Sequence, residues 1–176
     1  MIVPVDEATA RVATEPVLLA LLIWREARGE SVEAKLAVAY SVLNRVARPS
    51  WWGDNLDTVI GKRWQYSSLT ATGDPQLILF PRCSDPSWQE SLAVARAARG
   101  GSEPNPVPGA DSYYDDSITA PAWATVAAFR GKLGTLNFYD TDHDWEAPTV
   151  AAAAVTKGTT TTFDQELLAW LSAPKQ

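Results

Sequence analysis

An acidic residue continues the apolar face of a predicted helix and lies just before a break in that helix. The residue is Glu26, and counting back three, four and seven positions gives Ile23, Leu22 and Leu19. These positions share one helical face, so the carboxyl group is expected to point inward. Desolvation raises the pKa of a carboxyl group, and a glutamate that keeps its proton near neutral pH can act as the general acid that cleaves a sugar linkage. The sequence therefore indicates an acid presented to a cleft.

An ion pair is the other role that residue type allows for this glutamate. Arg25, Arg28 and Arg45 are near it in the sequence. A buried glutamate is commonly paired with an arginine. At this point both roles stay open.

Two helices are expected to meet at the corner that carries the acid. The first covers residues 15–28, with Pro16 in its first turn and Gly29 ending it in a left-handed conformation. The second follows Ser31, which can cap it, and stops at Pro49. A corner held by two helices can present a side chain rigidly.

The rest of the chain predicts one more helix and a small sheet. The expected elements are a helical turn at 56–60, a helix from Ser84 or Asp85 to about Arg99, and strands at 111–115 and 134–140. The fold class is therefore α+β, dominated by helices, with a small antiparallel sheet. We expect residues 1–150 to form one domain, and residues 151–176 to form a linker and a C-terminal helix that packs on it.

Composition excludes several classes of function. One cysteine and one histidine exclude an internal disulfide and a metal site built from thiolates or several histidines. A net charge of -6 argues against nucleic-acid binding, and no apolar run is long enough to cross a bilayer. We expect no cofactor, no metal, no membrane partner and a monomer. The N-terminus lacks the pattern of a secretion signal, so we expect synthesis in a cytoplasm.

Tryptophan is abundant, with eight residues in the chain. Trp51, Trp52 and Trp64 lie in a loop-rich segment, and we expect at least one of them to line a groove and stack on a sugar. Core packing is the other role for each. Trp123 is expected in the core.

A set of short motifs occurs in a fixed order between Leu18 and Asp140. They are Glu26-Ala27-Arg28-Gly29-Glu30, Ala37-Val38-Ala39, Val42-Leu43-Asn44-Arg45-Val46, Gln65-Tyr66-Ser67, Gly109-Ala110 with Tyr113-Tyr114, Pro121-Ala122-Trp123-Ala124, and Gly134 with Phe138-Tyr139. The set resembles the cell wall hydrolase family, whose best-known members are the spore cortex-lytic enzymes. The resemblance implies a lysozyme-like domain that cuts the glycan strands of peptidoglycan. It also implies that Glu26 is the catalytic acid, and that the reaction is lytic transglycosylation, which leaves a 1,6-anhydro sugar.

Six further residues are candidates for binding the glycan. Hydrogen bonds to N-acetyl groups are expected from one loop, although hydrogen bonding within the loop is an equal alternative for it. Neighbouring strand residues point to opposite faces, so one tyrosine of the adjacent pair faces the cleft, and the resemblance selects Tyr113. The candidates are Gln65, Tyr66 and Ser67 in the loop, Tyr113 and Tyr139 in the strands, and Glu30.

The number of catalytic carboxylates decides the chemistry. A transglycosylase can use one glutamate twice, whereas a hydrolase usually needs a second carboxylate. Glu30 is the nearest rival, although a solvent-facing position at the start of the second helix is its other role. Four aspartates flank the predicted strands and could position a water instead; they are Asp115, Asp116, Asp140 and Asp142.

Two histidines that members of the family often carry are replaced here. Ser112 and Leu136 stand in those places, and the single histidine, His143, is expected in a loop. The replacement raises the alternative of an inactive peptidoglycan-binding module. For an active enzyme, the expected setting is a phage endolysin released at lysis or a bacterial cell-wall lytic enzyme. A metallopeptidase is disfavoured because the chain has no zinc-binding helix motif.

Overall fold

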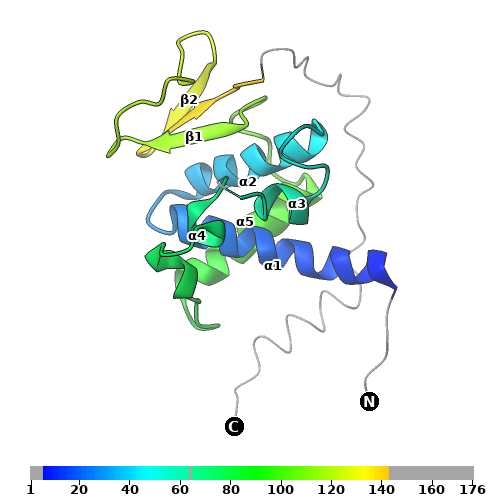
Figure 1. The fold of residues 1–176 in the computed structure, drawn as a ribbon. Coiled ribbons are helices and arrows are strands. Elements are labelled where there is room, and N and C mark those ends of the chain that lie inside the picture. The colour runs from blue at the N-terminus through cyan, green and yellow to red at the C-terminus, as the bar shows by residue number, and fades with distance from the viewer. Residues whose placement is uncertain (1–5, 64, 143–176) are drawn as a thin grey trace, which may run out of the picture.

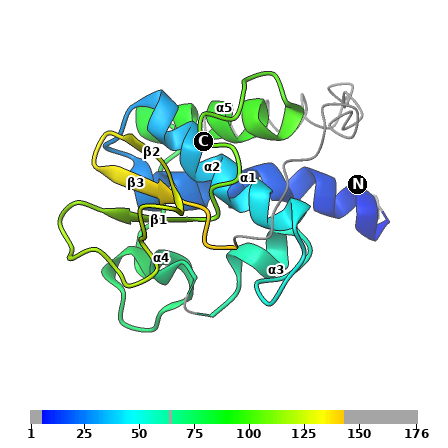
Figure 2. The ribbon, with the colours of Figure 1, turned by 90° about the horizontal axis from the view of Figure 1, so that it is seen from above.

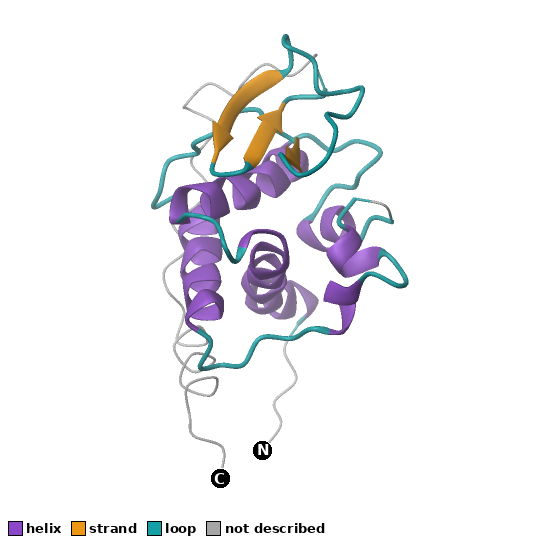
Figure 3. Cartoon of the chain, turned by 90° about the vertical axis from the view of Figure 1, so that its left-hand side faces the viewer, coloured by secondary structure: helices purple, strands orange, loops and turns teal. Residues whose placement is uncertain are grey.

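The computed structural model describes residues 6–63 and 65–142. Its helices are α1 (Glu7–Ala27), α2 (Val32–Ala47), α3 (Leu56–Ile60), α4 (Ser67–Thr70) and α5 (Pro86–Gly100), with a 3-10 turn η1 (Pro75–Ile78) and strands β1 (Ser112–Asp115), β2 (Phe129–Leu133) and β3 (Leu136–Tyr139). The sheet lies on one side of the helices, over α2 and the C-terminal end of α1 (Figures 1, 2 and 3). The predicted α+β class is confirmed. The predicted linker and last helix, Trp64 and His143 lie outside the described residues.

The first helix is longer than predicted. It begins at Glu7, where the Asp6 side chain accepts a hydrogen bond from the backbone N–H of Thr9 at 2.9 Å. Pro16 lies inside the helix and does not start it. The added turns carry small and polar residues without a clear apolar stripe. They are held by the cap and by Arg11, which pairs with Glu7 and Asp57.

The corner after α1 also differs from the prediction. Gly29 is not left-handed, and the C-cap of the helix, Arg28, has right-handed helical backbone angles. The turn is instead closed by the backbone N–H of Glu30, which donates to the carbonyl of Ala27 at 3.0 Å. Ser31 is extended and caps α2 through the N–H of Ala34, as predicted.

The apolar face of α1 lies in the core. Leu19, Leu22 and Ile23 have no exposed surface, which confirms the inward stripe that leads to Glu26. Helices α2 and α5 pack against α1 and complete this core. The cap of α5 at Asp85 and its end at the left-handed Gly101 follow the prediction.

The sheet has one strand more than the sequence predicts. Its order is β1-β3-β2 and all pairs are antiparallel. Strand β2 was not predicted, because a register shift between Phe129 and Gly131 interrupts the alternation of its side chains between the two faces of the sheet. Tyr113 pairs with Phe138 on the face that packs on the helices, whereas Tyr114 stacks on Tyr139 on the other face.

The turn between β2 and β3 requires a glycine. Gly134 has a φ of 59°, and a Cβ atom there would collide with the carboxylate of Glu30. That carboxylate accepts hydrogen bonds from the backbone N–H of Thr135 at 3.3 Å and from its hydroxyl at 2.9 Å. The turn is thereby tied to the corner between α1 and α2.

Replacing this glycine tests how tightly the turn is held. We expect Gly134→Ala to lower the free energy of unfolding by about 1–2 kcal/mol, because alanine is strained at positive φ. Urea unfolding measures the change. Gly100→Ala is the matched control, since a Cβ there meets nothing within 4 Å, and it should be neutral or stabilising. Equal stability of the two variants would contradict the strain at the turn.

Candidate active site

Glu26 lies in the last turn of α1 and receives one hydrogen bond on each carboxyl oxygen. The Ser68 hydroxyl, from α4, donates to Oε1, and the Tyr113 hydroxyl, from β1, donates to Oε2 at 3.1 Å. Glu26 as a whole residue is half-buried. Three segments far apart in the sequence therefore meet at one acid.

Burial controls the acid–base properties of this cluster. It raises the pKa of Glu26, while the hydrogen bonds from Ser68 and Tyr113 oppose that rise by stabilising the carboxylate. Burial, together with the nearby Glu26, also raises the pKa of Tyr113 well above its usual value. The phenol therefore stays protonated and remains a hydrogen-bond donor to the acid.

None of the neighbouring arginines forms an ion pair with Glu26 within the part of the chain that the structure describes. Arg25 donates to the carbonyls of Ser68, Leu77 and Leu79. Arg28 donates to the side chain of Gln76 at 2.9 Å. Glu26 therefore does not have the ion-pair role that its residue type allowed.

A cleft of about 490 Å³ opens beside the acid. Its walls come from the loop after α2, the start of α4, β1 and the loop between β1 and β2. The lining residues are Glu26, Arg45, Trp51, Trp52, Gln65, Tyr66, Ser67, Ser112, Tyr113, Trp123 and Thr141. Polar and aromatic groups in one concave site suit a ligand that offers both hydroxyl groups and apolar faces.

Four of the six predicted binding residues line this cleft: Gln65, Tyr66, Ser67 and Tyr113. The amide oxygen of Gln65 accepts a hydrogen bond from Arg45 at 2.6 Å. The NH₂ of Gln65 and the second lone pair of its amide oxygen are therefore left for a ligand. Tyr66 is buried, and burial raises the pKa of its phenol.

The structure corrects the positions of Glu30 and Tyr139, which are not among the cleft-lining residues. Glu30 is turned to Thr135 in the β2–β3 turn. Tyr139 projects from the outer face of the sheet, because β3 directs the neighbouring Phe138 into the core. It contacts the rings of Tyr114, Trp123 and Phe129.

Trp123 is also misplaced by the sequence analysis. It was expected in the core, but its side chain is 39% exposed and lines the cleft. The strands are short and the sheet has a solvent-facing side, so the loop that carries Trp123 covers that side only partly. Trp52, in contrast, is 3% exposed and its indole N–H donates to the carbonyls of Arg45 and Arg48.

Sequence reasoning missed Ser68 as a site residue. It follows the Gln65-Tyr66-Ser67 motif directly, and the short helix α4 turns its hydroxyl toward Glu26. The sequence offers no periodicity over four helical residues that would reveal this direction. Arg45 was considered only as an ion-pair partner. It instead holds Gln65 and the carbonyl of Asp111 beside the cleft.

The positions of the replaced family histidines have different surroundings. Ser112 lines the cleft, and its hydroxyl lies 3.2 Å from that of Thr141. Leu136 is buried in the core. Only the first replacement therefore changes a group that faces the cleft.

The four aspartates near the strands have other partners or positions. Asp115 accepts from the backbone N–H of Ser117 and shares the one hydroxyl proton of Thr135 with Glu30. Asp116 pairs with Lys132. Asp140 pairs with two arginines, Arg48 and Arg130. Neither these three nor Asp142 are among the cleft-lining residues.

Two searches of the described residues bear on other functions. Within residues 6–63 and 65–142, no group of three or more histidine, cysteine or acidic side chains could hold a metal ion. In the same ranges, no helix combines the length and apolar character that spanning a membrane requires.

Comparisons with known proteins agree with the fold. No curated protein matches the chain. The catalytic domain of the SleB protein from Bacillus cereus is 23% identical, with a TM-score of 0.54, over 72% of this chain and 89% of that domain. The catalytic domain of the germination-specific lytic transglycosylase SleB from Bacillus anthracis is 20% identical, with a TM-score of 0.55, over 78% of this chain and 99% of that domain. At these identities the similarity establishes a shared fold.

The sequence model of a family gives the stronger assignment. The model for cell wall hydrolases matches residues 29–139, which is more than half of the 176 residues. The matched span contains the cleft-lining residues except Glu26, which lies just before it, and Thr141, which lies just after it. The chain therefore belongs to the cell wall hydrolase family, a family of enzymes.

Proposed function

We propose that this enzyme cleaves the glycan strands of bacterial peptidoglycan by lytic transglycosylation, with Glu26 as acid and then base. The linkage attacked joins N-acetylmuramic acid to N-acetylglucosamine. One observation carries the proposal: among the cleft-lining residues that the structure describes, Glu26 is the one carboxylate. A mechanism that needs a second carboxylate finds no candidate in this lining.

The reaction starts with Glu26 protonated, the form that its raised pKa favours. Its proton passes to the glycosidic oxygen as the bond from that oxygen to the anomeric carbon of the muramic sugar breaks. The resulting carboxylate accepts hydrogen bonds from Ser68 and Tyr113, which stabilise the charge in a site of reduced polarity. Positive charge meanwhile develops on the sugar ring.

The second step regenerates the acid. The C6 hydroxyl of the same muramic sugar gives its proton to the Glu26 carboxylate, and its oxygen forms a bond to the anomeric carbon. The product is a 1,6-anhydro sugar, and no water is consumed. Gln65 and Ser67, with Tyr66 behind them, lie in the cleft where they can contact the N-acetyl groups.

The products distinguish this reaction from hydrolysis. Purified peptidoglycan treated with the enzyme should release fragments whose ends are one water lighter than reducing ends, as measured by mass spectrometry. If every fragment carries a reducing end, the enzyme is a hydrolytic muramidase. If no fragments form while the protein still sediments with peptidoglycan, it is an inactive binding module.

The setting is part of the proposal. A cell wall hydrolase that acts on glycan strands fits a phage endolysin released at lysis, or a bacterial lytic enzyme, acting as a monomer. Antibacterial lysis by protein added outside the cell, compared with protein expressed inside it, tests the first setting. No cofactor enters the reaction as written.

The two donors on the acid should set the pH range of activity. A general acid works only while protonated, so activity falls as pH rises through the pKa of Glu26. Ser68 and Tyr113 hold that pKa down, and their removal should raise it. We expect Ser68→Ala and Tyr113→Phe to shift the alkaline limb of kcat/KM to higher pH.

Ser67→Ala is the matched control for this experiment. Ser67 adjoins Ser68 and lines the cleft, but donates no hydrogen bond to Glu26 among the described contacts. Its variant should keep the position of the limb. A shift to lower pH in Ser68→Ala would show that the hydroxyl does not stabilise the carboxylate.

A further inference from the structure

Two exposed tryptophans line the cleft from different parts of the chain. Trp51, in the loop after α2, is 62% exposed, and Trp123, in the loop between β1 and β2, is 39% exposed. Burying a large aromatic ring is favourable, so leaving two of them exposed in one cleft costs stability unless a ligand covers them. Each therefore calls for an explanation.

Both rings are oriented by aromatic partners that are themselves fixed. Trp51 contacts Trp52 with ring centroids 5.5 Å apart, and Trp52 is anchored by its hydrogen bonds to the end of α2. Trp123 makes edge contacts with Tyr114 at 6.1 Å and with Tyr139 at 5.7 Å. An aromatic ring held in place before binding loses little conformational freedom when a ligand covers it.

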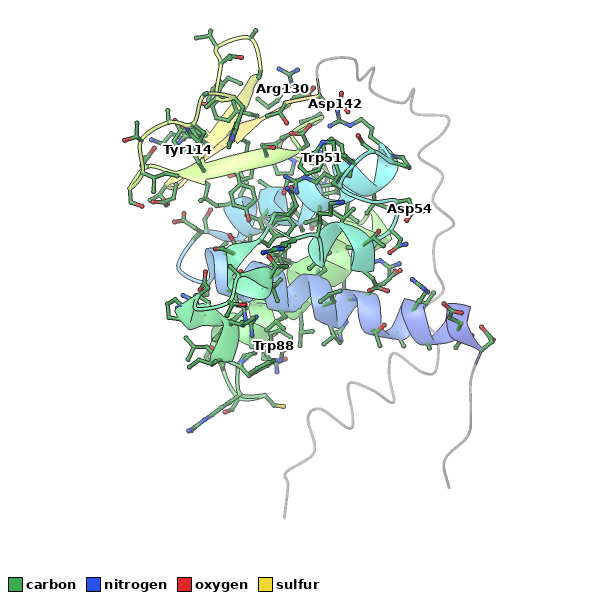
Figure 4. All side chains as sticks on the ribbon, viewed as in Figure 1. Trp51, Asp54, Trp88, Tyr114, Arg130 and Asp142 are labelled. Atoms are coloured by element: carbon green, nitrogen blue, oxygen red, sulfur yellow. The ribbon has the colours of Figure 1, made fainter. Side chains whose placement is uncertain are left out.

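The two rings belong to different regions of the cleft. Trp51 comes from the loop after α2 and Trp123 from the loop between β1 and β2. Figure 4 shows Trp51 apart from Tyr114, one of the two ring partners of Trp123. Tyr113, in the same strand, carries the hydrogen bond to Glu26. A chain of sugars that fills the cleft beside the acid would therefore meet aromatic surface from two separate loops.

We propose that Trp51 and Trp123 are platforms that stack on the apolar faces of two different sugar rings of the glycan. The inference rests on the proposed function. It gives the enzyme a reason to act on a polymer, because binding energy from remote sugars can be used to place the reacting bond. Hydroxyl groups at the ring edges remain free for the polar residues of the cleft.

Binding to purified peptidoglycan sacculi tests the platforms directly. In a Glu26→Gln background, which prevents turnover, Trp51→Ala and Trp123→Ala should each weaken co-sedimentation by about tenfold, the usual scale for a truncated aromatic anchor. Trp51→Phe and Trp123→Phe should keep most of the affinity. Phe80→Ala is the control, because Phe80 is a 71% exposed aromatic residue outside the cleft lining.

Activity assays separate platforms from structural residues. With Glu26 intact, the tryptophan-to-alanine variants, assayed well below their melting temperatures, should lose kcat/KM on long glycan strands and keep an unchanged alkaline limb. Affinity within about twofold of the parent for both alanine variants, or an equal loss in Phe80→Ala, overturns the inference. Absence of anhydro products from the otherwise unaltered enzyme, with tryptophan-dependent binding retained, defeats the proposed reaction and leaves the platforms standing.

Discussion

Glu26→Gln should remove glycan cleavage almost completely, with a loss of about 10²–10⁴-fold in kcat. The amide has the size of the carboxyl group and can still accept a hydrogen bond from Ser68, whose hydroxyl donates to Oε1. It cannot donate a proton to the glycosidic oxygen, nor take one from the C6 hydroxyl. Release of soluble fragments from purified peptidoglycan, followed with time, measures the loss.

The matched control for this variant is Glu30→Gln. Glu30 belongs to the same corner between α1 and α2, but its carboxylate is bonded to Thr135 and is outside the cleft lining. We expect it to retain most activity. Equal activity of Glu26→Gln and the unaltered enzyme removes Glu26 from the acid role, whereas strong loss in Glu30→Gln with an intact fold would make Glu30 a second catalytic group.

Arg48→Met should cause the largest loss of stability, about 3–5 kcal/mol in the free energy of unfolding. Arg48 is 8% exposed and pairs with two carboxylates, Asp140 at 3.2 Å and Asp111 at 3.5 Å, which are 2% and 0% exposed. Methionine has a similar length but leaves both buried carboxylates without this cation. Since the free energy of unfolding of a protein domain is roughly 5–15 kcal/mol in total, the variant should lose a large share of its stability. Urea unfolding at neutral pH measures it.

Arg130→Met provides the comparison. Arg130 pairs with the same Asp140 at 2.9 Å, but its side chain is 32% exposed. Water replaces much of what that pair contributes, so the expected cost is about 1 kcal/mol or less. Equal costs for the two variants would show that burial does not govern this network.

The sequence predicts the helical part of the fold because capping and periodicity there are local. Ser31 and Asp85 cap the helices that follow them, and Leu19, Leu22 and Ile23 mark the buried face. The start of α1 at Glu7 was not predicted, because a proline is typical of the first turn of a helix and Pro16 therefore indicated a later start. Helix propensity strongly disfavours a proline inside a helix. Pro16 nevertheless lies inside α1, so the rest of the structure outweighs that propensity here.

The acid was predictable, but its surroundings were not. Glu26 stands on a recognisable stripe, whereas the direction of the Ser68 hydroxyl depends on a single turn of helix. Tyr113 was separable from Tyr114 by the alternation of a strand together with a family resemblance. Tyr139 was assigned to the cleft, because nothing in β3 alone shows which face of the sheet is covered.

The arginine beside the acid has a consequence for how this enzyme can vary. Arg25 donates hydrogen bonds to the carbonyl of Ser68 at 2.8 Å and to those of Leu77 and Leu79 at 3.1 and 2.9 Å. The two ends of the intervening stretch are thus held to α1 by Arg25, which is next to Glu26 in the sequence. Insertions or deletions between these two ends can change the shape of the stretch while the Ser68 hydroxyl, which holds down the pKa of Glu26, keeps its position. Within this stretch the charge of Asp74 raises the pKa of Glu26, so substitution there changes the strength of the acid without moving it.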